Sequence, residues 1–239
     1  CSLALVKGES LVDDYGKGRP SVKNFFDAAH SEQHVIPEDR LQAKRARLLD
    51  ASSGPVRFTY FGRLVGRKGI DYCIRAVVKA RTELGADITF TIIGSGPEEE
   101  KLRALIEEQK AESHVFLEPP IPFGPKLFAR LFELDTLLAA PLTEDTPRSA
   151  FDAMASGMTL CAFDTEYYQT LAGFGPMVRT TRWLEVDDMA RALVEVAADR
   201  EGLVRAQEAA RRFALENTQE IWLEKRLAWT EEFCGAGGS

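Results

Sequence analysis

Two carboxylates, Glu144 and Asp152, have a spacing that could place both at one ligand site. Glu144 follows an apolar run at residues 136–142, and Asp152 lies eight residues further along the chain. If the run is a strand of an open α/β sheet, both side chains can reach the crevice at its carboxyl end, where such sheets bind ligands. Each carboxylate can accept two hydrogen bonds from a vicinal diol. The pair therefore suits recognition of a sugar.

The segment after Glu144 admits two interpretations. If a helix begins near Pro147, Glu144 lies in the loop above its positive end, and Asp152 points outward from its second turn. Three apolar residues then face the sheet: Phe151, Met154 and Ala155. The structural alternative is an i, i+4 ion pair of Asp152 with Arg148, which contributes only about 0.2–0.5 kcal/mol, beside a solvated Glu144. The residue types alone support both interpretations equally.

A basic, glycine-rich loop is a second candidate site. Residues 61–69 read FGRLVGRKG and join an apolar run to an amphipathic pattern. Backbone N–H groups at a helix start, together with Arg63 and Lys68, can bind phosphate or diphosphate. The alternative is a solvated basic loop in which the glycines, Gly62 among them, serve only as turns.

A second glycine turn, IGSGP at residues 93–97, also joins a strand pattern to a helix pattern. It lacks the GxGxxG spacing and the later ribose-binding acid of a nicotinamide-dinucleotide site. Gly94 serves either a ligand contact or a tight turn that lets the helix pack on the sheet. The three histidines have no metal-ligand spacing and no GxSxG motif occurs, so neither a metal site nor a serine nucleophile is predicted.

Short β-rich runs alternate with helical periods from Pro55 onward, which is typical of βαβ units and a parallel sheet. The predicted strands are Val56–Phe61, Ile88–Ile93, Val115–Leu117, Thr136–Ala140, Thr159–Phe163 and Met177–Arg179. Helices are predicted near Glu38–Leu49 and, after the last strand, over Asp187–Ala198, Glu201–Glu216 and Thr218–Phe233. The pattern therefore predicts an α/β fold with a parallel sheet and flanking helices.

Composition restricts the function class. The formal charge of −7 over 239 residues argues against broad nucleic-acid binding, which needs many cations on one face. No apolar run approaches the roughly 18 residues of a membrane-spanning helix. Cys73 and Cys161 lie within apolar patterns and no CxxC spacing occurs, which indicates reduced thiols. We expect a cytoplasmic protein, with peripheral attachment to a membrane left open.

Four segments in sequence order together resemble the donor-binding half of the retaining, two-domain (GT-B) glycosyltransferases of family 4, or group 1. They are FGRLVGRKG, FTIIGSGPEEEKL, HVFLEPPIP and TEDTPRSAFDAMASGMTLCAF, which span residues 61–163. The resemblance implies a Rossmann-like fold in which Arg63 and Lys68 hold the donor diphosphate, Glu144 faces the transferred sugar and Asp152 binds the ribose hydroxyls. It implies further donor contacts from Gly62, Gly94, Asp145, Thr146, Arg148 and Ser149.

The resemblance also implies a domain organisation. Residues 1–52 would be the end of an acceptor domain and the crossover between domains, residues 53–234 the donor domain, and residues 235–239 a flexible tail. The opening SLALVKG is expected to be a buried strand of a longer protein, whose acceptor domain is otherwise missing here. Trp222 and Trp229 are seven residues apart, so they should share one helix face.

Two positions depart from the family pattern. The usual second glutamate is Asp152, and Asp145-Thr146-Pro147 replaces the glycines that usually follow the first glutamate. These departures leave the donor geometry and the donor identity open. The sequence names neither the base, the sugar nor the acceptor.

The resemblance implies a hexosyltransferase that binds a nucleotide-sugar and transfers the sugar with retention of configuration to an unknown acceptor. No cofactor or metal is expected, because helix dipoles, Arg63 and Lys68 can stabilise the leaving diphosphate. We expect the 239 residues alone to bind donor without transferring sugar. The alternative is a degenerate domain that binds a nucleotide or a protein without catalysis. A sugar-nucleotide epimerase is disfavoured because no further acid–base pair is evident.

Overall fold

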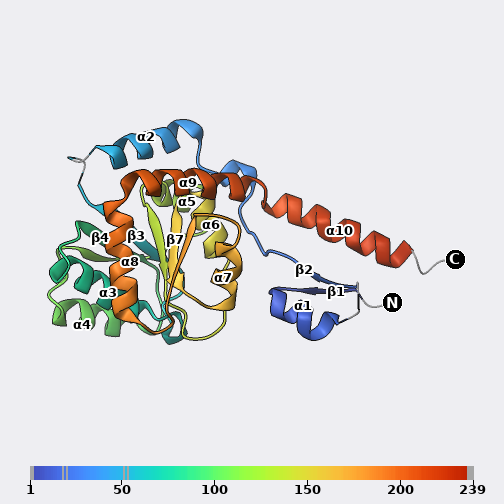
Figure 1. The fold of residues 1–239 in the computed structure, drawn as a ribbon, viewed down its shortest axis with the longest axis horizontal. Coiled ribbons are helices and arrows are strands. Elements are labelled where there is room, and N and C mark those ends of the chain that lie inside the picture. Colours follow the sequence, from blue (N-terminus) through green and yellow to red (C-terminus); the bar gives the residue numbers. More distant parts are fainter. Residues whose placement is uncertain (1–2, 18, 20, 51, 53, 236–239) are drawn as a thin grey trace.

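The computed structural model describes residues 3–17, 19, 21–50, 52 and 54–235. Its centre is a six-stranded parallel sheet with the strand order β5-β4-β3-β6-β7-β8 (Figure 1). The strands are β3 (Val56–Phe61), β4 (Ile88–Ile93), β5 (Val115–Glu118), β6 (Thr136–Ala139), β7 (Thr159–Phe163) and β8 (Val178–Thr181). The predicted α/β, Rossmann-like fold is confirmed, and three of the six predicted strands have the observed bounds.

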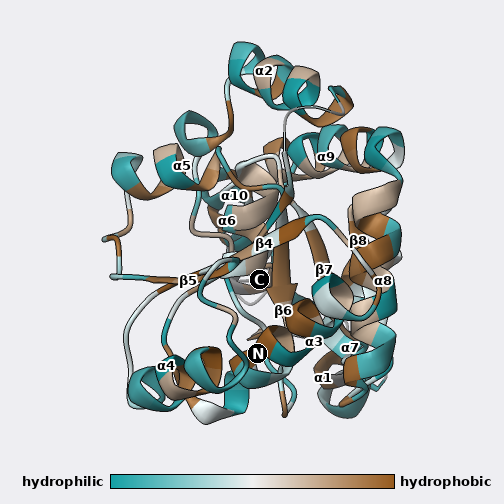
Figure 2. Ribbon diagram, turned by 90° about the vertical axis from the view of Figure 1, so that its left-hand side faces the viewer, coloured by the Kyte–Doolittle hydropathy of each residue, from teal (hydrophilic) through white to brown (hydrophobic). Residues whose placement is uncertain are grey.

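Helices cover both faces of the sheet. One core cluster joins it to α3 (Ile70–Thr82), α4 (Glu99–Glu108) and α8 (Val186–Ala198). The other joins it to α5 (Pro125–Leu131), α6 (Ser149–Ala155), α7 (Glu166–Ala172) and α9 (Arg200–Leu215). The strands of the large sheet carry mostly hydrophobic residues, whereas helices such as α2 and α4 carry many hydrophilic ones (Figure 2). Nearly all residues of β3, β4, β6 and β7 are buried, which is why these strands read as nearly continuous apolar runs.

The first residues form a separate small unit. β1 (Ala4–Val6) and β2 (Val22–Asn24) pair in parallel as a two-stranded sheet, with α1 (Glu9–Gly16) between them in the chain. The expectation of a buried opening strand is wrong, because Leu5 is 36% exposed. Two strands with one short helix cannot cover both faces of a sheet. Ser2, the first residue of the predicted strand, lies outside the described residues.

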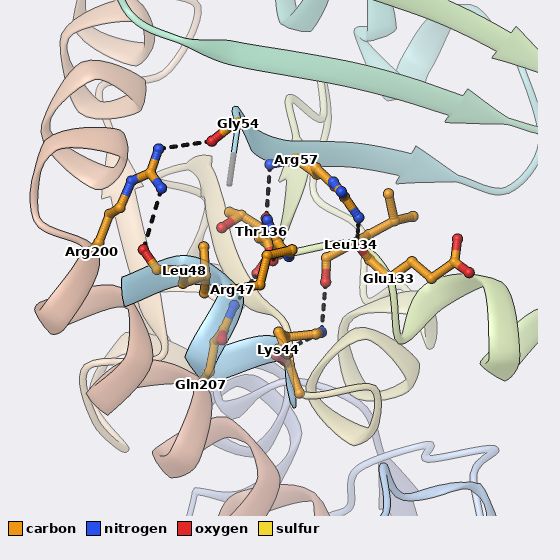
Figure 3. A network of polar contacts seen from close by, with 12 residues as sticks. Lys44, Arg47, Leu48, Gly54, Arg57, Glu133, Leu134, Thr136, Arg200 and Gln207 are labelled. Atoms are coloured by element: carbon orange, nitrogen blue, oxygen red, sulfur yellow. Dashed lines mark hydrogen bonds and ion pairs between the residues drawn. The ribbon is translucent and has the colours of Figure 1, made fainter. Parts of the chain in front are cut away.

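Helix α2 (Glu38–Leu49) is fixed to the amino end of the large sheet by a polar network (Figure 3). The buried ammonium of Lys44 donates to three backbone carbonyls, those of Leu134 at 2.7 Å, Ser156 at 3.0 Å and Gly157 at 3.3 Å. Arg47 forms an ion pair with the buried Asp135, which directly precedes β6. The predicted helix is confirmed, and it belongs to the packing of the large sheet.

The last helix, α10 (Gln219–Gly235), leaves the large sheet and runs beside β1 and β2 (Figure 1). Trp222 and Trp229 share a face as predicted, with ring centroids 6.5 Å apart. Residues 236–239 of the predicted tail lie outside the described residues. Within the described ranges, no helix is long and apolar enough to cross a membrane.

Candidate functional site

Three loops meet at the carboxyl end of the large sheet, where β3, β4 and β6 end. β3 lies between the other two strands. Gly62, after β3, donates its backbone N–H to the carbonyl of Ile93 at 3.0 Å, and Leu142, after β6, donates to the carbonyl of Arg67 at 2.9 Å. The glycine-rich loops and the acidic loop, which are far apart in the sequence, therefore form one continuous surface.

Close packing explains two of the glycines. A Cβ atom at Gly94 would lie 2.0 Å from the carbonyl oxygen of Gly62, and one at Gly69 would lie 2.0 Å from that of Ala140. Gly69 also has a φ of 59°, in the left-handed region that favours glycine. Gly94 is therefore required for loop packing, and its contact with a ligand stays a prediction.

A cavity of about 490 Å³ opens beside these loops, and we call it the glycine cavity. Arg63 lines it with an exposed side chain, and the Arg63 carbonyl accepts a hydrogen bond from the Tyr60 hydroxyl at 3.0 Å. The other lining residues are Phe61, Gly62, Ile93, Gly94, Ser95, Gly96, Pro97, Pro120, Ile121, Phe123 and Leu127. The Arg63 guanidinium beside an apolar cavity lined by glycines suits a ligand that joins an anionic group to a planar ring.

Lys68 is already engaged by a carboxylate. Its ammonium forms an ion pair with Asp145, and Arg67 contacts the same Asp145 oxygen at 2.9 Å. The Lys68 and Asp145 side chains are 17% and 18% exposed. Burial works to raise the pKa of Asp145, but the hydrogen bonds and charges of Lys68 and Arg67 outweigh it and hold that pKa below its ordinary value. Asp145, which departs from the family pattern, thus neutralises the charge of Lys68, the residue predicted to bind the diphosphate.

Glu144 is exposed and lies against the start of α7. Its carboxylate accepts a hydrogen bond from the backbone N–H of Glu166 at 3.2 Å. Nearby, the Tyr167 hydroxyl donates to the carbonyl of Pro147 at 3.1 Å. These contacts fix the 144–148 loop above α6, which begins at Ser149, two residues later than predicted.

Asp152 is buried, so the expectation that it points outward to solvent is wrong. The residue is 6% exposed, and one carboxylate oxygen has no hydrogen-bond partner among the described residues. α6 is covered by the sheet on one side and by α9 on the other, which buries every residue from Ala150 to Ala155. Burial raises the Asp152 pKa to about 7, against the opposing charge of Arg148. The Asp152 backbone N–H donates to the carbonyl of Arg148 at 3.2 Å, but among the described residues no ion pair joins the two side chains, and the predicted i, i+4 pair is not formed.

A second cavity, of about 360 Å³, lies between the 144–148 loop and the N-terminal segment, and we call it the loop cavity. Predicted residues line one wall: Glu144, Asp145, Thr146 and Arg148. The opposite wall was missed by the sequence analysis and includes Lys7, Leu11, Asn24, Phe25, Phe26 and Asp27. Lys7 and Asp27 form an ion pair there. The only sequence signal for this wall is the polar–aromatic run that follows β2.

The predicted donor residues therefore fall into neighbouring groups. Gly62, Arg63 and Gly94 line the glycine cavity. Lys68, Asp145 and Ser149 line a third, small cavity that shares Asp145 with the loop cavity. Asp152 lines none of these three cavities. It lies near Tyr167, however: burial is the main cause that raises the Tyr167 pKa, and the charges of Asp145 and Asp152 raise it further. In the part of the chain that the structure describes, no group of three or more His, Cys, Asp or Glu residues could hold a metal ion.

Comparison with known proteins adds a family match. A family model described as glycosyl transferases group 1 matches residues 45–213. A D-inositol 3-phosphate glycosyltransferase of Nocardia farcinica is 30% identical over 96% of this chain and 52% of its own length. A 2-deoxystreptamine glucosyltransferase of Streptomyces kanamyceticus is 28% identical over 74% of this chain and 51% of its own length. The chain thus spans about half the length of these relatives.

Solved structures share the fold. The Anabaena protein HepE, determined in complex with UDP, superposes with a TM-score of 0.78 at 16% identity, covering 97% of this chain and 64% of that one. A Staphylococcus aureus TarM mutant superposes with a TM-score of 0.72 at 19% identity, covering 94% of this chain and 43% of that one.

Proposed function

The chain belongs to the group 1 glycosyl transferases, and on that premise we propose that the carboxyl end of its large sheet binds a nucleoside-diphosphate sugar. The observation that carries the proposal is the junction of three loops, in which Arg63 lines the glycine cavity and Lys68 lines the third, small cavity. Cations beside closely approaching backbone suit a diphosphate. The Anabaena HepE structure, which was determined with UDP, has the same fold, and this supports the proposal that the fold binds a nucleoside diphosphate here.

The placement of the donor follows from the cavities. The nucleoside enters the glycine cavity, which opens beside Gly62 and Gly94, and the diphosphate lies along Arg63 and Lys68. The ribose hydroxyls are assigned to Asp152, which lines none of the three cavities but has one buried carboxylate oxygen that accepts no hydrogen bond from the described residues. A diol can donate two hydrogen bonds to that carboxylate and offset its desolvation. The transferred sugar then faces Glu144 in the loop cavity, and the acceptor enters from the same side.

The chemistry assigned to the site is retaining glycosyl transfer. The bond between the anomeric carbon and the diphosphate oxygen breaks, the acceptor oxygen forms the new glycosidic bond on the same face, and the acceptor's hydroxyl proton passes to the leaving diphosphate. Negative charge develops on the leaving diphosphate, where Arg63 and Lys68 stabilise it in the transition state. In this proposal residues 53–234 are the donor domain and residues 1–52 the end of the acceptor domain, and no metal or cofactor is required.

Calorimetric titration with matched nucleoside mono- and diphosphates of each base tests the proposal. Diphosphates should bind more tightly, because each added charge-assisted contact contributes about 1.5–3 kcal/mol. Equal affinity for mono- and diphosphates of every base would contradict it. The panel also identifies the base.

A second candidate function is binding without transfer. The specific observation in its favour is the ion pair of Asp145 with Lys68, which neutralises a predicted donor ligand. Release of sugar from a nucleotide-sugar by the full-length protein, and its loss in Glu144→Ala, separates the two functions. Donor binding with no release in any condition would favour the non-catalytic domain.

A further inference from the structure

The loop at residues 144–148 is held by contacts that a bound donor would compete for. Glu144 accepts a hydrogen bond at the start of α7, and the carbonyl of Pro147 accepts one from Tyr167. Between these two contacts, Asp145 reaches across to the loop after β3, 77 positions earlier in the sequence, and pairs with Lys68. Arg67 contacts the same carboxylate oxygen.

The Asp145 carboxylate occupies the position where a phosphate oxygen would be expected. It is a planar anion, it accepts from both an ammonium and a guanidinium, and the Lys68–Asp145 pair is mostly shielded from water. A phosphate group would make the same kind of contacts with the same donors. A phosphate that binds these two donors would lie close to the Asp145 carboxylate and repel it, so phosphate binding at this position favours departure of Asp145.

We propose that Asp145 is an internal competitor for the donor, holding Lys68 and Arg67 until a diphosphate displaces it. This inference rests on the proposed function, because it assumes that Lys68 binds the donor diphosphate. Displacement makes affinity depend on the charge of the entering group. A diphosphate carries more negative charge than one carboxylate, so it displaces Asp145 from Lys68 and Arg67. A monophosphate carries less charge and displaces Asp145 less readily. Asp145 therefore increases the preference of the site for diphosphates over monophosphates.

The same exchange links donor binding to the position of Glu144. Asp145 is adjacent to Glu144 in the chain, and both line the loop cavity. When Asp145 leaves Lys68, the constraint on the middle of the loop is released, and Glu144 is free to turn from α7 toward the sugar. The loop sequence Asp145-Thr146-Pro147 is therefore a specificity-determining element of the donor site.

The test is a double-mutant cycle on nucleoside-diphosphate affinity, measured by calorimetry with the wild-type chain, Asp145→Asn, Lys68→Ala and the double variant. Asp145→Asn keeps the shape of the side chain and removes its charge. Asp87→Asn is the matched control, since it also removes one carboxylate from an arginine pair, at an exposed position before β4. Asp145→Ser serves as a second variant, and circular dichroism verifies folding.

We expect Asp145→Asn to bind diphosphates roughly three- to tenfold more tightly, the size of effect typical of a partly buried charged contact. The gain should be smaller for monophosphates, absent for the nucleoside and for Asp87→Asn, and lost in the Lys68→Ala background. Tight binding by Asp145→Asn where the wild type binds none would also support the proposal.

Two outcomes would overturn it. If the wild type binds diphosphates through Lys68 but Asp145→Asn and Asp145→Ser bind no more tightly, Asp145 is no competitor, and the proposed function stands. If neither the wild type nor any Asp145 variant binds a nucleoside diphosphate, the proposed function itself fails, and the competitor role fails with it.

Discussion

At the scale of single residues, two of the carboxylates predicted to bind the donor, Asp145 and Asp152, have opposite environments. Asp145 is held ionised by Lys68 and Arg67, which lower its pKa against the effect of burial. Asp152 is buried without a cationic contact, and burial raises its pKa to about 7. Asp145 and Asp152, seven residues apart, thus differ in charge near neutral pH, because Lys68 and Arg67 of a distant loop contact Asp145 and, in the described structure, contact no oxygen of Asp152.

Asp152→Asn should weaken ribonucleotide binding and leave binding of the 2′,3′-dideoxy analogues nearly unchanged. The amide keeps one acceptor oxygen but loses the charge, and a charge-assisted hydrogen bond contributes about 1.5–3 kcal/mol. The comparison is best made by calorimetry at pH 8, above the Asp152 pKa of about 7. Equal losses for both ligand types would assign Asp152 a structural role.

The same substitution should change how stability depends on pH. The folded-state pKa of Asp152 is about 7 against an ordinary 3.8, so the folded chain retains a proton that the unfolded chain has released. Asp152 therefore makes stability fall as pH rises from about 4 to about 7, by on the order of a few kcal/mol. Urea unfolding of wild type and Asp152→Asn across this range should show a shallower decline for the variant. Parallel curves would contradict the assignment.

At the scale of elements, most of the α/β organisation could be predicted, because strands buried on both faces leave apolar runs in the sequence. Val56–Phe61 and Ile88–Ile93 were predicted with their observed bounds for this reason. The burial of Asp152 could not be predicted, since it depends on α9, whose residues lie some fifty positions later. The Lys68–Asp145 pair depends on a tertiary contact that leaves no local pattern. The wall that includes Lys7 and Phe25 left only the polar–aromatic run after β2, which does not show that this run faces the 144–148 loop.

The anchoring of α2 leads to a stability prediction. Lys44→Met should lower the free energy of unfolding by about 2–5 kcal/mol, since three carbonyls at the amino end of the sheet lose their donor. Arg45→Met is the control on the same helix, because the Arg45–Glu208 pair is exposed and such pairs contribute at most about 1 kcal/mol. Equal effects of the two substitutions in urea unfolding would refute the anchoring role.

At the scale of the whole molecule, the aromatic side chain of Phe26 joins the N-terminal segment to the body. Its ring centroid lies 5.2 Å from those of Phe151 in α6 and Trp222 in α10. It also lies 6.2 Å from that of Phe213 in α9. One residue thus connects the small sheet, the body around the large sheet and the last helix, and the loop cavity depends on that connection because Phe26 lines it.

Phe26→Ala should release the β1–β2 unit and α10 from the body without unfolding the large sheet. Loss of a packed phenylalanine costs about 3–5 kcal/mol in a well-packed site. Hydrogen exchange should therefore quicken in residues 4–24 and 219–233 and stay slow in β3 and β6. Phe116→Ala, at a 41% exposed position on β5, serves as the control. Uniform quickening over the whole chain would contradict a local role.

The central claim, that this chain binds a nucleoside-diphosphate sugar through the loop after β3, is tested most directly by the affinity of Lys68→Ala for the preferred nucleoside diphosphate. Lys79→Ala is the control, since Lys79 lies in the last turn of the same α3 helix that follows this loop and, among the described residues, forms ion pairs with the exposed Glu83 and Asp187. We predict a loss of about tenfold or more for Lys68→Ala and no change for Lys79→Ala. An affinity of Lys68→Ala within about a factor of two of wild type, less than 0.5 kcal/mol, would contradict the claim.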